Sequence, residues 1–101
     1  MIDFDAVTGF DWDEGNSLKN LMTHEVSQAE AEQVFLNAPL KLTPIGRPAV
    51  SEPRYRALGR TMQGRLLTVI FTLRFANTKI RVISARDMHR KERTEHEQKT
   101  T

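Results

Sequence analysis

The feature that most constrains the fold is a long, almost continuous apolar run near the middle of the chain, LLTVIFTL, which begins at Leu66. A turn signal stands on each side of it, Gln63-Gly64 before and Asn77 after. An apolar run of this length between turns is typical of a strand in the middle of a sheet. It is also far shorter than the roughly 20 residues that a membrane helix requires. We therefore predict a central strand over residues 65–75 and no membrane-spanning segment.

Further strands are expected on either side of the central one. Residues 54–61 precede the first turn, residues 79–85 follow the second, and both have the pattern of strands. Residues 40–45 form a shorter candidate, and residues 2–7 alternate apolar and acidic side chains, as an edge strand or an unattached arm would. Because strands joined by tight turns run antiparallel, we expect an antiparallel sheet of about four strands.

The first of two N-terminal helices is predicted over residues 14–24. Leu18, Leu21 and Met22 share one apolar face at the i, i+3, i+4 spacing of a helix. His24 ends this segment, where the helix dipole favours a cationic capping group. Because an imidazole has an unperturbed pKa of about 6.5, His24 is also a candidate general acid or base.

A capping box begins the second helix. The Ser27 hydroxyl and the Glu30 carboxylate are spaced so that each accepts from the other residue's backbone N–H. We predict a helix over residues 28–37, which ends before Pro39 because proline lacks the N–H that the next turn needs.

The capping-box spacing recurs at Ser84-Ala85-Arg86-Asp87 and predicts a C-terminal helix over residues 86–97, polar nearly all round. We treat residues 1–101 as a single domain, with 1–9 a possible arm or edge strand and 97–101 a disordered tail. The predicted class is α+β, with two N-terminal helices, an antiparallel sheet of about four strands and a C-terminal helix. One sheet face is expected to be covered by helices and the other to be open.

Charge is strongly segregated along the chain, although the formal total is only +2. Residues 1–40 carry eight carboxylates and one lysine, a net charge of −7. Residues 41–93 carry thirteen cations, ten of them arginine, against three carboxylates, a net charge of +10. Because a guanidinium binds phosphate oxygens through two parallel hydrogen bonds, the basic segment indicates a polyanionic partner. The alternative is that these arginines are solvated or pair with the acidic N-terminal helices.

The chain contains no cysteine, which excludes disulfides, thiolate metal sites and a thiol nucleophile. A reducing cytoplasm is therefore the expected location. Asp3 and Asp5 stand where a signal peptide would carry positive charge. No glycine-rich phosphate loop is present, and we expect neither a cofactor nor a metal.

One carboxylate and several arginines are expected to share a sheet face. Alternation places Glu52, Arg54 and Arg56 on one side of the strand before the central one. The arginines expected to join them from neighbouring elements are Arg74, Arg81 and Arg86. A glutamate so placed can take the proton of a ribose 2′-hydroxyl while arginines stabilise the charge of a phosphorane-like transition state. The alternative is an ordinary surface ion pair of Glu52, worth less than about 1 kcal/mol.

The pattern resembles the BrnT toxins of bacterial type II toxin–antitoxin pairs, small ribonucleases with a RelE-like fold. The similarity covers about residues 10–96. The matching segments are Phe10-Asp11-Trp12-Asp13, Asn20, His24-Glu25-Val26-Ser27, Glu52-Pro53-Arg54, Leu58-Gly59, Gly64-Arg65-Leu66-Leu67, Thr72-Leu73-Arg74, Ile80-Arg81-Val82-Ile83-Ser84-Ala85-Arg86 and Glu92-Arg93. The chain differs from the family's usual pattern at four positions. It has Asn16 and Thr23 where the family usually has lysine, Glu25 where it has glycine, and His96 where it has tyrosine.

The resemblance implies metal-independent RNA cleavage, inhibition of translation, and neutralisation by a ribbon-helix-helix antitoxin similar to BrnA, through which alone the toxin meets operator DNA. We expect Glu52 to act as general base. The candidate catalytic residues are Glu52, Arg54, Arg74, Arg81, Arg86 and His24. The candidate RNA-contacting residues are Lys19, Arg56, Arg65 and Arg90. The alternative hypothesis is a catalytically degenerate protein whose basic face binds an antitoxin or RNA without cleaving it.

Overall fold

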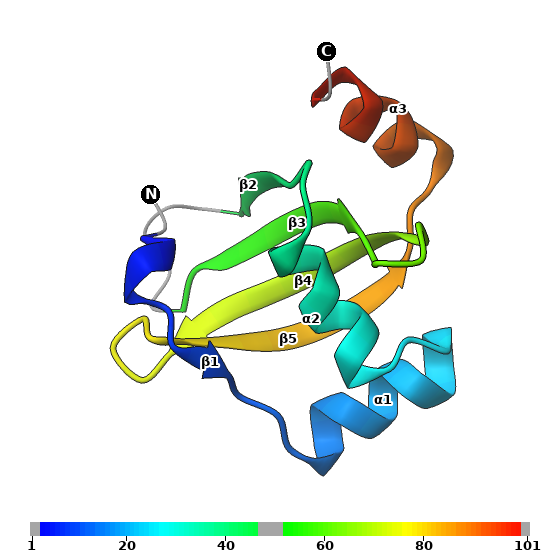
Figure 1. Cartoon of the computed structure of the whole chain (residues 1–101). Helices are drawn as coiled ribbons and strands as arrows, with labels where there is room; N and C mark the ends of the chain where they lie inside the picture. The colour runs from blue at the N-terminus through cyan, green and yellow to red at the C-terminus, as the bar shows by residue number, and fades with distance from the viewer. Residues whose placement is uncertain (1–2, 47–51, 100–101) are drawn as a thin grey trace.

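The long apolar run forms β4 (Leu66–Arg74), the middle strand of a five-stranded sheet with the order β1-β5-β4-β3-β2 (Figure 1). The structure, a computed structural model, describes residues 3–46 and 52–99. β4 pairs antiparallel with β3 (Arg54–Arg60) on one side and with β5 (Lys79–Asp87) on the other. β2 (Lys41–Ile45) extends the sheet beyond β3, also antiparallel. The four predicted strands from residue 40 onward are therefore confirmed.

The sheet is mixed, which corrects the expectation of an antiparallel sheet of about four strands. β1 (Gly9–Phe10) pairs parallel with β5 at the far edge. With only two residues, β1 is too short to show the alternation from which strands are predicted. Residues 2–7, expected to be extended or an arm, instead contain a 3-10 turn, η1 (Phe4–Ala6), which the Asp3 side chain caps by accepting from the Asp5 N–H.

The core lies between one sheet face and α2 (Gln28–Leu36), which begins at the predicted capping box. Val34 of α2 and Phe71 of β4 are fully buried, and the Phe35 ring meets Phe71 edge-on with centroids 5.0 Å apart. A Cβ at Gly59 of β3 would lie 2.8 Å from Val34 Cγ1. Glycine at this position therefore allows α2 to pack closely on the sheet.

α1 (Glu14–His24) lies beside β5, at the edge that the short β1 leaves uncovered (Figure 1). Its bounds are as predicted, but its buried residues are Asn16 and Asn20 rather than the apolar ones. The Asn16 side chain donates to Val82 O at 3.0 Å, and Asn20 Oδ1 accepts from the Ala85 N–H at 2.8 Å. These amides satisfy backbone groups on the open edge of β5, which would otherwise lack partners.

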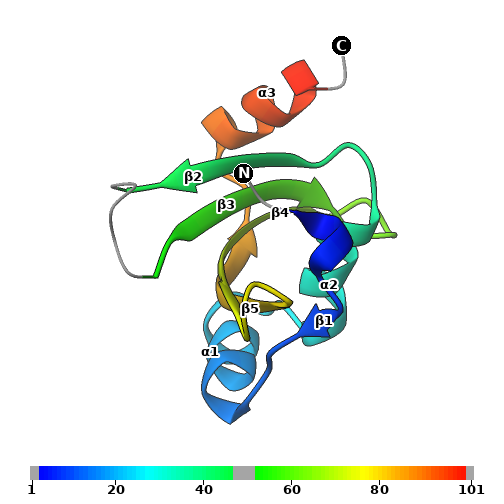
Figure 2. The ribbon, with the colours of Figure 1, turned by 90° about the vertical axis from the view of Figure 1, so that its left-hand side faces the viewer.

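α3 (Arg90–Lys99) covers part of the sheet face that was expected to be open, on the side away from α2 (Figure 2). It begins four residues later than predicted, because the segment with the capping-box spacing continues β5. Its contacts with the sheet are polar, and the nearly buried His96 places Nε2 2.9 Å from Pro39 O. Residues 97–99, expected to belong to a disordered tail, are helical, whereas residues 100–101 lie outside the described residues.

Candidate nucleic-acid interface and active site

Alternation along the strands places five predicted arginines on the sheet face opposite α2. Arg54 of β3 and Arg81 of β5 pair with Thr72 of β4 from its two sides. Arg86 pairs with Thr68, whose hydroxyl donates to Glu92 of α3. The five predicted site arginines of this face are Arg54, Arg56, Arg74, Arg81 and Arg86. We refer to them as the arginine face.

These arginines do not converge on Glu52, which corrects the expected arrangement. Within residues 3–46 and 52–99, the Glu52 side chain binds Arg74 alone, with Oε1 2.9 Å from Arg74 Nη2, and both side chains are almost half exposed. Arg81 is held instead by Asp11 at 3.3 Å and Asp13 at 2.9 Å, which lie between β1 and α1. The Asn16 backbone N–H and the Arg81 guanidinium together hold the pKa of Asp13 below its ordinary value. The carboxylates that meet the arginine face are thus spread over three regions of the chain.

Two further arginines of this face pair with carboxylates of α3. Arg86 binds Glu92 through both guanidinium Nη atoms, at 2.7 and 3.0 Å. Arg56 pairs with Glu95, which also contacts Lys41 at 3.2 Å. Although burial opposes ionisation of Glu92, hydrogen bonds from Arg86, the His89 N–H and Thr68 lower its pKa to about 2. α3 is therefore fixed on the sheet mainly by charge pairing.

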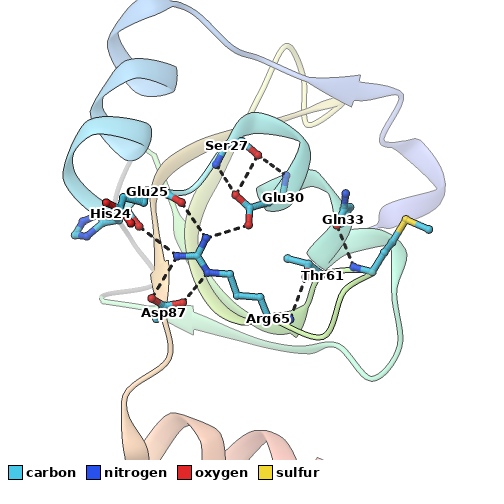
Figure 3. A network of polar contacts seen from close by, with 9 residues as sticks. His24, Glu25, Ser27, Glu30, Gln33, Thr61, Arg65 and Asp87 are labelled. Atoms are coloured by element: carbon cyan, nitrogen blue, oxygen red, sulfur yellow. Dashed lines mark hydrogen bonds and ion pairs between the residues drawn. The ribbon is translucent and has the colours of Figure 1, made fainter.

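Arg65 was predicted to contact RNA, yet its guanidinium is fully engaged within the protein (Figure 3). Nε and Nη2 donate to the Asp87 carboxylate, Nη1 donates to Glu30 Oε2 and Glu25 O, and Nη2 also donates to His24 O. All five guanidinium N–H donors thus have acceptors. Arg65 joins the end of α1, the start of α2 and the end of β5, and an RNA contact would have to displace one of these bonds.

Three predicted cations are free to meet a polyanion. The side chains of Arg54, Arg90 and Lys19 are exposed and have no hydrogen-bond or ion-pair partner within residues 3–46 and 52–99. Arg54 lies on the arginine face, Arg90 begins α3, and Lys19 lies on α1. A phosphate could approach these three side chains without breaking an internal contact, which makes them the most available of the predicted site cations.

An open pocket of about 520 Å³ lies where the end of α1 meets the end of β5. It brings together three predicted site residues, His24, Arg65 and Arg86, and adds His89. Sequence analysis did not single out His89, because a histidine in a charged segment is usually solvated. The remaining predicted catalytic residues lie toward the opposite end of β4, where Arg54 pairs with Thr72. The predicted site is therefore divided between this pocket and the Glu52 end of the arginine face.

Within residues 3–46 and 52–99, no group of three or more His, Asp or Glu side chains is placed to hold a metal ion. No helix in these ranges is long and apolar enough to cross a bilayer.

Comparison with known proteins identifies the family. Residues 12–92 match the family described as "Ribonuclease toxin, BrnT, of type II toxin-antitoxin system". No curated protein matches the chain. Among solved structures, the 1.1 Å crystal structure of the Brucella abortus ribonuclease toxin, BrnT, matches with a TM-score of 0.57 and 21% identity. The match covers 83% of this chain and 100% of the Brucella chain, so the two proteins share a fold. The protein is therefore a member of the BrnT family of type II toxin–antitoxin toxins.

Proposed function

We propose that this toxin is a metal-independent endoribonuclease of RelE-like fold that acts in the cytoplasm and inhibits translation. The observation that carries the proposal is the pocket between α1 and β5, which holds two imidazoles, His24 and His89, beside Arg86. Arg90 directly follows His89 in the chain, and its side chain is exposed and has no partner in the described ranges. Two imidazoles, which can accept and donate protons, and a nearby cation are components that phosphodiester transesterification can use.

The proposed reaction is attack of the ribose 2′-oxygen on the adjacent phosphorus. One histidine takes the 2′-hydroxyl proton, and the other donates a proton to the 5′-oxygen as the bond from phosphorus to that oxygen breaks. Arg90 and Arg86 stabilise the negative charge on the phosphate oxygens in the transition state. The products are a 2′,3′-cyclic phosphate and a free 5′-hydroxyl, and no metal takes part.

Glu52 is the second candidate for the general base. Its carboxylate is accessible and contacts Arg74 at 2.9 Å, and Arg54, whose side chain has no partner in the described ranges, follows two residues later in the chain. The test is cleavage of end-labelled RNA in excess chelator by the wild-type chain and by His24→Ala, His89→Ala and Glu52→Gln. We expect each histidine variant to lose about 100-fold or more in rate, a typical contribution of acid–base catalysis, and Glu52→Gln to lose much less.

The outcomes separate the two centres. Loss of cleavage in Glu52→Gln and in Arg81→Ala, with the histidine variants unaffected, would assign the reaction to the arginine face instead. Expression of the same variants alone in bacteria then shows whether growth inhibition follows the cleavage rate. Products that appear only when a divalent metal is added would contradict the proposed mechanism.

One observation favours a second function, a protein that binds RNA or its antitoxin without cleavage. Arg56, Arg74, Arg81 and Arg86 are all paired with carboxylates of the chain itself, as in a structural network. This function predicts RNA binding with no cyclic-phosphate product from the wild-type chain. In either case we propose that the antitoxin is of ribbon-helix-helix type and that the toxin meets operator DNA only through it.

A further inference from the structure

The apolar stripe of α1 faces solvent. Leu18, Leu21 and Met22 are 48%, 49% and 80% exposed, although all three lie on one side of the helix. The opposite side carries Asn16 and Asn20, which are committed to the backbone of β5 through the hydrogen bonds described above. Because turning the stripe inward would remove both amides from β5, α1 has only one orientation in which that edge is satisfied. The exposure of the stripe is thus built into the fold.

The ends of the stripe carry unpaired negative charge. Glu14 precedes Leu18 by four residues and lies on the same side of the helix, and Glu25 is the C-cap residue at the other end. Both glutamates are exposed, and their carboxylates have no hydrogen-bond or ion-pair partner within residues 3–46 and 52–99. At 1.5 Å per residue, the eleven-residue helix that carries them at its two ends is roughly 16 Å long. A complementary surface is apolar in the middle and basic at both ends.

We propose that the α1 stripe is the docking surface for one apolar helix of the antitoxin, which carries a basic side chain at each end to meet Glu14 and Glu25. Membership of a type II toxin–antitoxin family implies an antitoxin. The apolar stripe with a carboxylate at each end of α1 requires an antitoxin helix that is apolar in the middle and basic at its ends. An apolar helix face laid along three apolar side chains is a common mode of peptide recognition.

An antitoxin helix docked on the stripe would also block the pocket, which would explain how the antitoxin neutralises the toxin. This second step, unlike the docking itself, rests on the proposed function. Met22 belongs both to the stripe and to the lining of the pocket that holds His24 and His89. A helix seated on the stripe therefore lies at the mouth of the pocket and excludes RNA from it. The stripe is itself an interaction surface whether or not the pocket is catalytic.

The experiment measures binding of the antitoxin by titration calorimetry, with the product of the reading frame that adjoins the toxin gene as the probe. Leu18→Gln and Leu21→Gln keep good helix formers at exposed positions, so both variants should fold. We expect each to weaken binding about tenfold and the double variant to weaken it more. Leu36→Gln, at a leucine of α2 that is 78% exposed, is the matched control and should bind like the wild-type chain.

A second pair of variants tests the charges independently of the apolar contacts. Glu14→Gln and Glu25→Gln are expected to weaken binding severalfold at low salt, and the difference should shrink at high salt because ion pairs are screened. The Tm of every variant is compared with that of the wild-type chain, to check that the fold is unchanged. Wild-type binding by the double leucine variant, or loss of binding in Leu36→Gln alone, would overturn the proposal, as would a wild-type chain that does not bind this probe.

RNA cleavage by the free proteins separates this inference from the proposed function. The Leu18→Gln and Leu21→Gln variants should cleave like the wild-type chain but escape inhibition by the antitoxin. A wild-type chain that binds the antitoxin through the stripe but cleaves no RNA would contradict the proposed function and leave the docking proposal standing. Self-association of the wild-type chain that these two variants abolish, seen by sedimentation, would assign the stripe to a second copy and overturn the proposal.

Discussion

At the scale of single residues, the arginines of this toxin differ in how many of their donors are already engaged. Arg65 uses all five guanidinium N–H groups within the chain, whereas the Arg54 side chain has no partner in the described ranges. Sequence analysis grouped both as candidate site residues, because the one-dimensional pattern contains no information on which carboxylates fold next to which arginine. The structure separates a guanidinium that joins elements from one that is free to bind phosphate.

This difference predicts opposite effects of two alanine substitutions. Arg65→Ala should lower the free energy of unfolding by about 3 kcal/mol, because it leaves Asp87, Glu30 and two carbonyls without their donor. Arg54→Ala should change it by less than about 0.5 kcal/mol while weakening RNA binding and lowering its salt dependence. Urea unfolding and filter binding measure the two quantities. Equal stability losses would contradict the assignment.

Glu25 adopts a backbone conformation that glycine prefers. It is the C-cap of α1 with φ 56° and ψ 38°, in the left-handed region, and its N–H bonds to Leu21 O. The resemblance noted above gives glycine as the usual residue at this position. Glu25→Gly should therefore stabilise the protein by about 1 kcal/mol, which for a chain of this size raises Tm by about 4–8 °C.

Glu25→Ala is the control for this prediction. It removes the same carboxylate but keeps the Cβ that makes the left-handed region unfavourable, so its Tm should stay near that of the wild-type chain. Differential scanning calorimetry compares the three proteins. A Glu25→Gly protein no more stable than Glu25→Ala would show that backbone strain at this cap is negligible.

At the scale of elements, short sequence patterns predicted where the helices and strands begin and end. They did not predict which side of α1 faces the protein. The bounds of α1 and the start of α2 follow from side chains within a few residues of each other, and the predictions were confirmed there. The orientation of α1 depends on the free edge of β5, which lies more than sixty residues away along the chain. Likewise, Ile83 is an extra residue opposite the step from Ile70 to Phe71, and this bulge breaks the alternation expected along β5.

The role of the α1 amides gives a prediction that helical periodicity alone would reverse. Asn20→Ala removes the acceptor of the Ala85 N–H, which is buried, and should cost about 2–3 kcal/mol of stability. Leu18→Ala on the exposed side should cost less than about 0.5 kcal/mol. Chemical denaturation ranks the two variants. A larger loss in Leu18→Ala would mean that the apolar side of α1, and not its amide side, packs against the protein.

At the scale of the whole molecule, the acidic and basic segments of the sequence pair with each other. Arg81 meets Asp11 and Asp13, and Arg65 meets Glu30, so two arginines of the basic segment bind carboxylates of the first forty residues. The charge asymmetry was evident from composition, but its use in internal pairing was one of two open alternatives. The charge of a residue does not indicate which oppositely charged residue will lie beside it in the fold. The partners of Arg81 and Arg65 could therefore not be predicted from the sequence.

Glu92 connects this pairing to the pH dependence of stability. Its pKa is lowered to about 2 in the folded protein from an ordinary value of 4.5. Above pH 4.5 the carboxylate is ionised in both states and its stabilisation is fully present. As the pH falls from 4.5 toward 2, the unfolded chain takes up the proton first, and the stabilisation is lost. This shift in the Glu92 pKa corresponds, by linkage, to about 3 kcal/mol of folding free energy at neutral pH.

Glu92→Gln should therefore be less stable than the wild-type chain by about 3 kcal/mol at pH 7, and the gap should close between pH 4.5 and pH 2. Urea unfolding across this pH range measures the gap directly. Glu14→Gln is the control, because the Glu14 carboxylate is exposed and has no partner within residues 3–46 and 52–99, so its curve should run parallel to that of the wild-type chain. A constant gap for Glu92→Gln would show that the charge pairing with Arg86 does not hold α3 on the sheet.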